Sequence, residues 1–285
     1  MIRIDAHQHF WKYDPPEFSW VTDDMAVLRR DFLPEELARE LSANGMDASI
    51  AVQSSQSEKG TSFLLNLAVM HKKIAGVVGW VDLRAANVRD RLREYSRYEK
   101  LRGFRHIVQG EPDDRFLLHE DFLRGLACLK EFHFTYDILI YPKQLPAAVE
   151  LAKRMPEQPF VVDHMAKPLI KSKEIDSWAR HMRDLAASPN VYCKVSGLIT
   201  EAEWRTWRPE NFTLYLDVVF DAFGPDRLMF GSDWPVCLIA GTYNQVKQLV
   251  EAYIAGRYAV DAQKRKVGQA IFGENAACFY GIQGR

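Results

Sequence analysis

The sequence lacks long apolar runs and is poor in cysteine. No stretch of its 285 residues approaches the roughly 20 consecutive apolar residues that a transmembrane helix requires. The chain enters a strand directly, without a charged segment followed by an apolar one, so we expect no signal peptide. Its four cysteines (128, 193, 237 and 278) form no C-x-x-C pair, which predicts reduced thiols in a cytoplasmic protein rather than a disulfide framework.

The sequence also lacks an excess of charge of either sign. The formal net charge is −1, so we expect neither a nucleic-acid-binding surface nor a polybasic membrane surface. No linker rich in Gly, Pro or Ser and no low-complexity segment divides the chain. Because α/β barrels of about 250 residues are commonly one domain, we predict a single domain over residues 1–285.

Short apolar strands alternate with amphipathic helices along the whole chain. A strand around Ile4 is followed by a long loop over 12–30, whose length is typical of functional loops. Further strands are predicted over 49–53, 74–82, 101–107, 134–141, 159–164, 190–195 and 228–231. Helices are predicted over 31–45, 61–73 (capped by Thr61), 87–100, 121–133, 143–154, 173–188, 210–223, 243–257 and 261–280. Eight such units and one extra C-terminal helix predict a (β/α)8 TIM barrel.

Polar side chains stand at the predicted carboxyl ends of these strands, where such barrels place their active sites. His7 and His9 share a face of the first strand, because side chains two apart point the same way. The other ends carry Gln53, Asp82, Arg105, His106, Asp137, Tyr141, Asp163, His164, Lys194, Ser196, Ser232 and Asp233. Converging imidazoles and carboxylates are costly in a buried barrel mouth without a task, which favours a functional site.

Three motifs resemble the amidohydrolase superfamily, in particular its amidohydrolase-related branch of TIM-barrel proteins. They are Asp5-Ala6-His7-Gln8-His9, Val162-Asp163-His164 and Gly231-Ser232-Asp233-Trp234-Pro235. Residues 103–109, 194–198 and 271–276 are also similar to that branch, so the resemblance covers essentially the whole chain. Within the branch, the sequence is most similar to sugar-lactone hydrolases of the L-fuconolactonase and L-rhamnonolactonase kind.

The resemblance implies a hydrolase of carbohydrate metabolism that acts on a carboxylic ester. It would open a small-molecule aldono-1,4- or 1,5-lactone, such as L-fucono- or L-rhamnonolactone, to the sugar acid. Members of the superfamily with two metals carry a lysine at the end of strand 4 and a histidine at the end of strand 5. This sequence has neither, which predicts one divalent ion (Zn or Mn) or none.

The hypothesis assigns roles to two groups of residues. Asp233 is the general base that takes a proton from water and returns it to the ring oxygen. His7, His9 and His164 either polarise the carbonyl or hold the ion, of which Asp233 is then a further ligand. The predicted substrate-binding residues are Gln53, His106, Arg105, Trp11, Tyr141, Lys194 and Trp234, with Trp80 as another candidate for the aromatic wall.

Alternative interpretations accompany these assignments. In these interpretations, Arg105 would pair with Asp82 or Asp137, Lys194 would pair with Asp163, and the tryptophans would belong to the core. A metal-dependent decarboxylase of aromatic acids, or a hydrolase of a dicarboxylate lactone, would use Arg105 and Lys194 to hold a carboxylate. A sugar-binding barrel without turnover is the alternative outside enzymes. The residues leave the sugar, the metal and the oligomeric state open.

Overall fold

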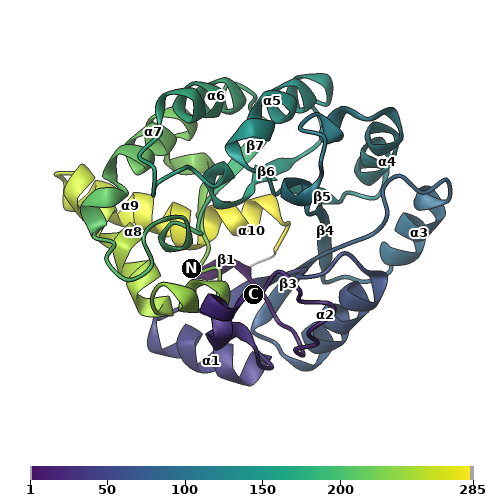
Figure 1. The fold of residues 1–285 in the computed structure, drawn as a ribbon, viewed down its shortest axis with the longest axis horizontal. Helices are drawn as coiled ribbons and strands as arrows, with labels where there is room; N and C mark the ends of the chain where they lie inside the picture. Colours follow the sequence, from purple (N-terminus) through teal and green to yellow (C-terminus); the bar gives the residue numbers. More distant parts are fainter. Residues whose placement is uncertain (1, 283–285) are drawn as a thin grey trace.

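A parallel eight-stranded sheet ringed by helices makes up the computed structural model, which describes residues 2–282 (Figure 1). The strands are β1 Ile4–Gln8, β2 Ala48–Val52, β3 Ile74–Gly79, β4 Leu101–His106, β5 Thr135–Ile138, β6 Phe160–Val162, β7 Val191–Val195 and β8 Leu228–Phe230. The helices that follow them are α1 Pro34–Ala43, α2 Glu58–Met70, α3 Val88–Tyr95, α4 Glu120–Glu131, α5 Leu145–Arg154, α6 Asp176–Ala186, α7 Thr213–Phe223 and α8 Tyr243–Arg257. Within the described residues, no helix is long and apolar enough to cross a membrane.

Each strand pairs in parallel with the next one in the sequence, from β1 to β8. The sheet closes between its first and last strands through two backbone hydrogen bonds. The N–H of Asp233 donates to the carbonyl of His7 at 2.8 Å, and the N–H of His9 donates to the carbonyl of Trp234 at 2.7 Å. The predicted (β/α)8 barrel is therefore confirmed.

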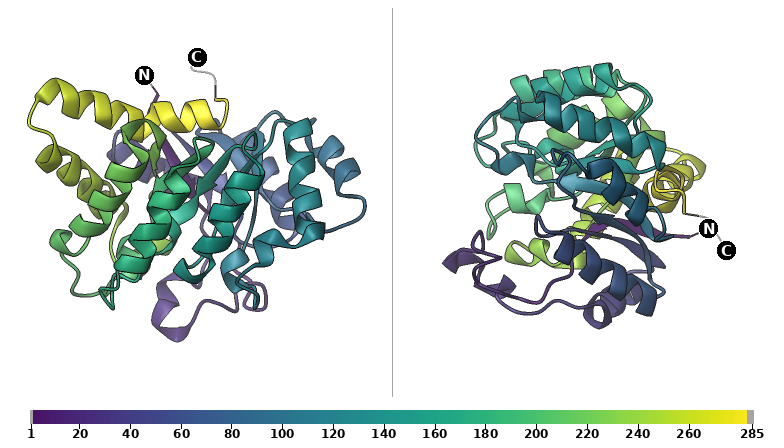
Figure 2. Two further views of the ribbon diagram at one scale, coloured as in Figure 1. Left: turned by 90° about the horizontal axis from the view of Figure 1, so that it is seen from above. Right: turned by 90° about the vertical axis from the view of Figure 1, so that its right-hand side faces the viewer.

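The half of the barrel in which the strands begin is filled by apolar side chains from alternate positions of those strands. Ile4, Ile50, Val78, Val161 and Met229 are fully buried in this cluster. Helix α10, Asn275–Phe279, lies across the end of the barrel where the strands begin, close to the N-terminus (Figure 2). Burying each such side chain stabilises the fold by about 1.5–3 kcal/mol. The opposite end of the barrel is left for polar groups.

The extra C-terminal helix predicted over 261–280 is present but interrupted. Helix α9, Asp261–Gln269, runs into a π-helical turn over Ala270–Glu274 before α10 begins. Ile271 and Phe272 of that turn are buried, and Gly273 lies against the backbone of Ile2, where a Cβ would meet the carbonyl oxygen at 2.1 Å. The interruption turns α10 across the barrel end.

The predicted start of the second helix is wrong. Ser57, rather than Thr61, caps α2, since its hydroxyl accepts a hydrogen bond from the Gly60 N–H at 3.0 Å. Thr61 lies inside the helix and is buried, and its hydroxyl bonds both the N–H and the carbonyl of Trp80. Thr61 therefore joins the helix to the end of β3 instead of beginning the helix.

Several other strands and helices are shorter than predicted. The strands predicted over 74–82 and 134–141 end at Gly79 and Ile138, because the register with β4 ends there. Helix α3 ends at Tyr95, where the chain turns toward β4. Short 3-10 turns precede α5 and α7, and another, Asp23–Leu28, lies within the predicted 12–30 loop.

Candidate active site

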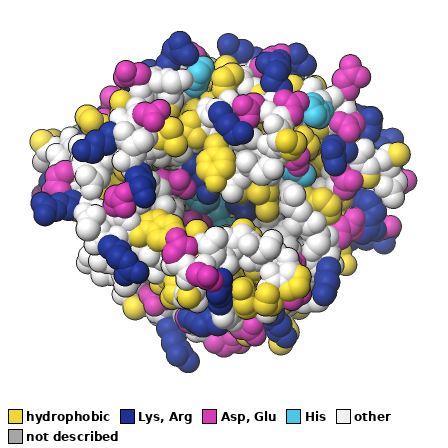
Figure 3. All heavy atoms as spheres, viewed as in Figure 1, with side chains coloured by type: hydrophobic (Ala, Val, Ile, Leu, Met, Phe, Trp, Pro, Cys, Tyr) yellow, Lys and Arg dark blue, Asp and Glu magenta, His cyan; other side chains and the backbone are white. Residues whose placement is uncertain are grey.

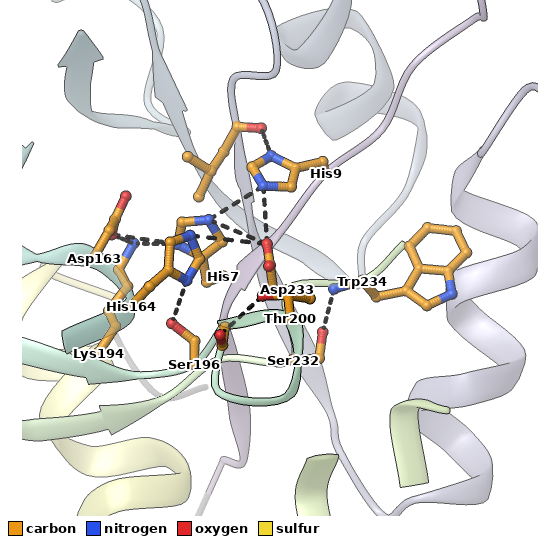
Figure 4. A network of polar contacts seen from close by, with 12 residues as sticks. His7, His9, Asp163, His164, Lys194, Ser196, Thr200, Ser232, Asp233 and Trp234 are labelled. Atoms are coloured by element: carbon orange, nitrogen blue, oxygen red, sulfur yellow. Dashed lines mark hydrogen bonds and ion pairs between the residues drawn. The ribbon is translucent and has the colours of Figure 1, made fainter. Parts of the chain in front are cut away.

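Three imidazoles and one carboxylate meet where β1, β6 and β8 end (Figure 4). The Nε2 atoms of His7 and His9 lie 3.2 Å apart. Asp233 Oδ1 lies 3.3 Å from His9 Nε2 and 3.9 Å from the Nε2 atoms of both His7 and His164. All four side chains are almost completely buried. On the outer surface, Figure 3 shows a hollow near the centre of this face, with blue and cyan side chains at its base.

The closure of the barrel itself brings His7, His9 and Asp233 together. The two backbone hydrogen bonds between the ends of β1 and β8 involve these residues or their direct neighbours. Asp233 has a φ of 56°, a left-handed conformation that is unusual for a residue other than glycine. Such strain persists only where the surroundings hold it, and it concentrates at functional sites. The junction between β1 and β8, which closes the barrel, is thus also the centre of the site.

His164 stands on a left-handed turn directly after β6. Four consecutive residues, His164 to Lys167, have φ between 49° and 56°. Non-glycine residues rarely adopt this conformation in succession, because each one costs roughly 1–2 kcal/mol. His164 Nδ1 lies 2.9 Å from the hydroxyl of Ser196, which fixes the ring so that Nε2 faces Asp233.

Two glycines make room for the histidines. A Cβ on Gly231 would lie 2.5 Å from the Cβ of His7, and one on Gly197 would lie 2.7 Å from Nδ1 of His164. Gly197 also has a φ of +63°, which favours glycine. These close approaches are the physical reason for glycine in the Gly-Ser-Asp and Ser-Gly segments.

We expect Gly231→Ala to push His7 out of place. Displacing a reacting group by about 1 Å costs about 100-fold in rate, and overpacking costs about 1–3 kcal/mol in stability. Gly256→Ala in α8 is the matched control, because a Cβ there meets nothing within 4 Å. Steady-state kinetics and thermal unfolding of both variants test this, and equal activity in the two would contradict the assigned packing.

Burial sets the charge states of the cluster. It lowers the pKa of His7 well below its usual value and that of His164 to about 4, so both rings are neutral near pH 7. Burial raises the pKa of Asp233, but His164, His9 and His7 outweigh it and hold that pKa below its usual range. The site therefore presents the neutral imidazoles of His7 and His164 beside an ionised carboxylate.

The donor atoms of this cluster fit one divalent metal ion. His9 Nδ1 lies 2.8 Å from the carbonyl oxygen of Val52, which only accepts, so Nδ1 carries the hydrogen and Nε2 has a free lone pair. Ligands bound about 2.0–2.2 Å from a tetrahedral Zn²⁺ stand about 3.3–3.6 Å apart. Four of the separations, at 3.2–3.9 Å, bracket that range, and the ligand atoms of His7, His164 and Asp233 all lie within 4.8 Å of one another. His7, His164 and Asp233 form the metal-capable group found among residues 2–282.

A buried charge network lies beneath the cluster. Lys194 Nζ, fully buried, lies 2.5 Å from Asp137 Oδ2 and 3.0 Å from Asp163 Oδ1. Arg105 Nη1 donates to Asp163 Oδ2 at 2.9 Å. The alternative pairing of Lys194 with Asp163 is therefore confirmed, whereas the pairing of Arg105 with Asp82 or Asp137 is wrong. Two cations and two carboxylates balance one another here.

Among the other predicted substrate-binding residues, Gln53 and Tyr141 have side-chain atoms that remain available to bind a ligand. Gln53 Nε2 donates to the carbonyl of Arg105 at 3.1 Å, and its buried Oε1 has no hydrogen-bond partner among the described residues. Tyr141 is 37% exposed, and Lys167 Nζ lies 5.4 Å from the centre of its ring.

His106, Trp11 and Trp234 are placed differently, outside the histidine cluster. His106 bonds Glu111 through Nε2 at 2.6 Å and accepts from the Trp80 indole through Nδ1 at 3.4 Å. The Trp11 indole N–H donates to the Arg30 carbonyl, and the ring packs against aromatic side chains of the 12–30 loop and its end. The indole of Trp234 points away from the histidines (Figure 4).

Sequence reasoning missed three contributors to the site. Asp5 accepts hydrogen bonds from the N–H groups of His7 and Ser232 and from the Ser232 hydroxyl, which ties β1 to β8. Lys167 and Glu201 form an ion pair at 3.5 Å beside the site, each with about a fifth of its side chain exposed. Asp5 lies within the first motif, two residues before His7, and this position in the motif could have indicated its role. The Lys167–Glu201 pair joins two loops and has no local signal.

A parallel barrel with imidazoles and a carboxylate at the ends of strands 1, 6 and 8 places the protein among the (β/α)8-barrel enzymes. The chain belongs to the amidohydrolase family, whose profile matches residues 4–282. It is 43% identical to the L-fucono-1,5-lactonase of Burkholderia multivorans and 35% identical to that of Burkholderia ambifaria. Both alignments cover 99% of this chain and 96% of the relative. A crystal structure of an amidohydrolase from Burkholderia multivorans with bound zinc superposes with a TM-score of 0.93 at 42% identity, covering 99% of this chain and 100% of that chain.

Proposed function

We propose that the protein hydrolyses a sugar lactone, with L-fucono-1,5-lactone as the first candidate. The observation that carries the proposal is the ionised Asp233 carboxylate, buried 3.3–3.9 Å from three imidazoles at the end of the barrel where active sites lie. The nearly full-length similarity to two proteins named L-fucono-1,5-lactonase supports the same substrate class.

In the proposed mechanism, Asp233 acts first as the general base and then as the general acid. Its carboxylate takes a proton from a water molecule while the water oxygen bonds to the lactone carbonyl carbon. The bond from that carbon to the ring oxygen then breaks, and Asp233 returns the proton to the ring oxygen. The product is an open-chain hydroxy acid, whose carboxyl group ionises at neutral pH. The low pKa of Asp233 keeps it ionised before each turnover.

His7 and His164 would stabilise the negative charge that develops on the carbonyl oxygen, whereas His9 presents a lone pair on Nε2, because its hydrogen is bonded to the carbonyl of Val52. Hydrogen-bond donors fixed in a buried site are worth more than donors in water, because they need no reorganisation during the reaction. His7, His9 and His164 would equally hold one divalent ion with Asp233. When bound, such an ion polarises the carbonyl and acidifies water.

Recognition of the sugar hydroxyls falls to groups around the hollow. Gln53 Oε1 is a buried acceptor without a partner among the described residues, and the Lys167–Glu201 pair and the Tyr141 hydroxyl offer further donors and acceptors. In a decarboxylase or a dicarboxylate-lactone hydrolase, Arg105 and Lys194 would hold a carboxylate. Both already pair with buried aspartates, which favours an uncharged sugar ring.

A substrate panel tests the proposal. Metal-analysed protein is incubated with aldonolactones of different stereochemistry and with aromatic acids, with and without chelator. We expect acid release from at least one aldonolactone and no CO2 from any aromatic acid. Evolution of CO2, or sugar binding without turnover of any lactone, would replace the lactonase assignment by the corresponding alternative.

A further inference from the structure

A charged pair lies at the mouth of the barrel, beside the histidine cluster. Lys167 ends the left-handed turn after β6, and its N–H donates to the carbonyl of His164 at 2.8 Å. Glu201 ends the 3-10 turn Ile199–Glu201, which follows β7. Lys167 Nζ lies 3.5 Å from Glu201 Oε1. The pair therefore joins the loop that carries His164 to the next loop around the barrel.

This pair can be reached by a ligand, unlike the ion pairs beneath the cluster. The side chains of Lys167 and Glu201 are 19% and 20% exposed, whereas the pairs beneath are buried. Glu201 and Thr200 line a groove of about 1000 Å³. The Thr200 hydroxyl donates to the carbonyl of Gly197 at 2.9 Å, and Gly197 packs against the ring of His164 (Figure 4). The groove therefore borders the histidine cluster.

Lys167 keeps hydrogen-bond donors for a ligand. An ammonium group carries three N–H donors, and the contact with Glu201 uses one of them. Among residues 2–282, Glu201 is the one carboxylate that pairs with Nζ, and the centre of the half-exposed Tyr141 ring lies 5.4 Å from it. A ligand in the mouth can therefore accept a hydrogen bond from Lys167.

The charge of Glu201 decides which ligands gain from that contact. A carboxylate that approaches Lys167 is attracted by the ammonium, but it is repelled by the Glu201 carboxylate 3.5 Å away. A hydroxyl group meets no such opposition, because it both donates and accepts. It can accept from Lys167 and donate to Glu201, so the pair suits an uncharged polyol better than an anion.

We propose that Glu201 is a specificity-determining residue, which neutralises Lys167 and makes the mouth of the barrel select uncharged sugar rings over carboxylates. The identity of the ring rests on the proposed function. Opening of the lactone creates a carboxylate, so the same pair weakens binding of the acid product and favours its release. Without Glu201, the Lys167 ammonium would bind carboxylates.

Calorimetric titration with succinate, an anion without sugar groups, is the primary test. Glu201→Gln keeps the shape of the side chain and leaves Lys167 without its counter-charge. We expect succinate to bind this variant about tenfold more tightly than the wild type, the effect of one hydrogen bond to a charged group. The titrations are made at mildly alkaline pH, because burial raises the pKa of Glu201.

Glu203→Gln is the matched control. Glu203 pairs with Lys171 at 3.0 Å across the same two loops, but 57% of the Glu203 side chain is exposed. Water and salt screen such a pair, so its loss should change succinate affinity by less than about twofold. An equal gain in Glu201→Gln and Glu203→Gln would mean that only the overall charge matters, and would overturn the proposal.

A double variant assigns the gain to one ammonium. Adding Lys167→Met to Glu201→Gln should return succinate affinity to the wild-type level. A gain that persists without Lys167, or no gain in Glu201→Gln at all, would also overturn the proposal. If Glu201→Gln does not fold, Glu201→Ala takes its place. If neither folds, Lys167→Met decides, because it should bind succinate no more tightly than the wild type does.

Inhibition by the acid product gives a second readout. Where the wild type opens a lactone, the product should inhibit Glu201→Gln more strongly, by a factor similar to the gain for succinate. A gain for succinate in a protein that opens no lactone would support the role of Glu201 and contradict the proposed function. Lactone opening without a gain for succinate would do the reverse.

Discussion

Asp233→Asn is expected to lower kcat for lactone opening by about 1000-fold, within the range for removal of a general acid–base group. Asparagine keeps the shape of the side chain but takes no proton from water and returns none to the ring oxygen. KM should change much less, because the carboxylate acts on the water rather than on the sugar hydroxyls. Steady-state kinetics measured by acid release separate these two constants.

The control for this variant is an exposed aspartate. Asp184→Asn, on the solvent side of α6, should keep wild-type kinetics. Thermal unfolding of both variants shows whether the fold is retained. A folded Asp233→Asn protein with wild-type kcat would remove Asp233 from the mechanism and leave the three imidazoles to explain any activity.

Lys194→Met is expected to lower the free energy of unfolding by about 3–5 kcal/mol, the usual cost of removing one partner from a buried ion pair. The variant leaves Asp137 and Asp163 buried without the ammonium that lies 2.5 Å and 3.0 Å from them. Arg105 still pairs with Asp163, whereas, within residues 2–282, the Asp137 side chain keeps the hydrogen bond from the Tyr280 hydroxyl at 2.9 Å and no other. Equilibrium urea unfolding measures the loss.

Two comparisons define the origin of that loss. Lys130→Met removes a lysine that pairs with Glu157 on the surface, with 57% of the Lys130 side chain exposed, and should cost less than about 1 kcal/mol. Adding Asp137→Asn to Lys194→Met removes the orphaned charge and should recover part of the stability. A loss for Lys194→Met no larger than that for Lys130→Met would contradict the buried network.

The architecture could be predicted from the sequence because barrel strands are buried on both faces. Runs such as Ala48–Val52 and Ile74–Gly79 are almost entirely apolar, and each is followed by a helical pattern of suitable length. The boundaries of individual helices were harder to predict from the sequence. Thr61 has the chemistry of a helix cap, but the space beside Trp80 draws its hydroxyl to the end of β3, and Ser57 caps α2 instead.

The candidate catalytic cluster followed from one rule, that polar residues at the carboxyl ends of barrel strands converge. His7, His9, His164 and Asp233 do so. Beneath them, the pairing of Lys194 with Asp163 was one of the predicted alternatives. The partner of Arg105 was not predicted, because it depends on which way the side chain leans inside the barrel. Arg105 stands next to Asp137 in the β4–β5 register but reaches across to Asp163, one strand further.

Opening of L-fucono-1,5-lactone by the purified protein tests the central claim most directly. Proton release is followed in weakly buffered indicator solution, corrected for spontaneous opening, and the sugar acid is identified in the product. We predict catalytic acid release by the wild type and about 1% or less of that rate for Asp233→Asn. No release above the spontaneous rate from this lactone or any other aldonolactone would contradict the assignment of the protein as a sugar lactonase.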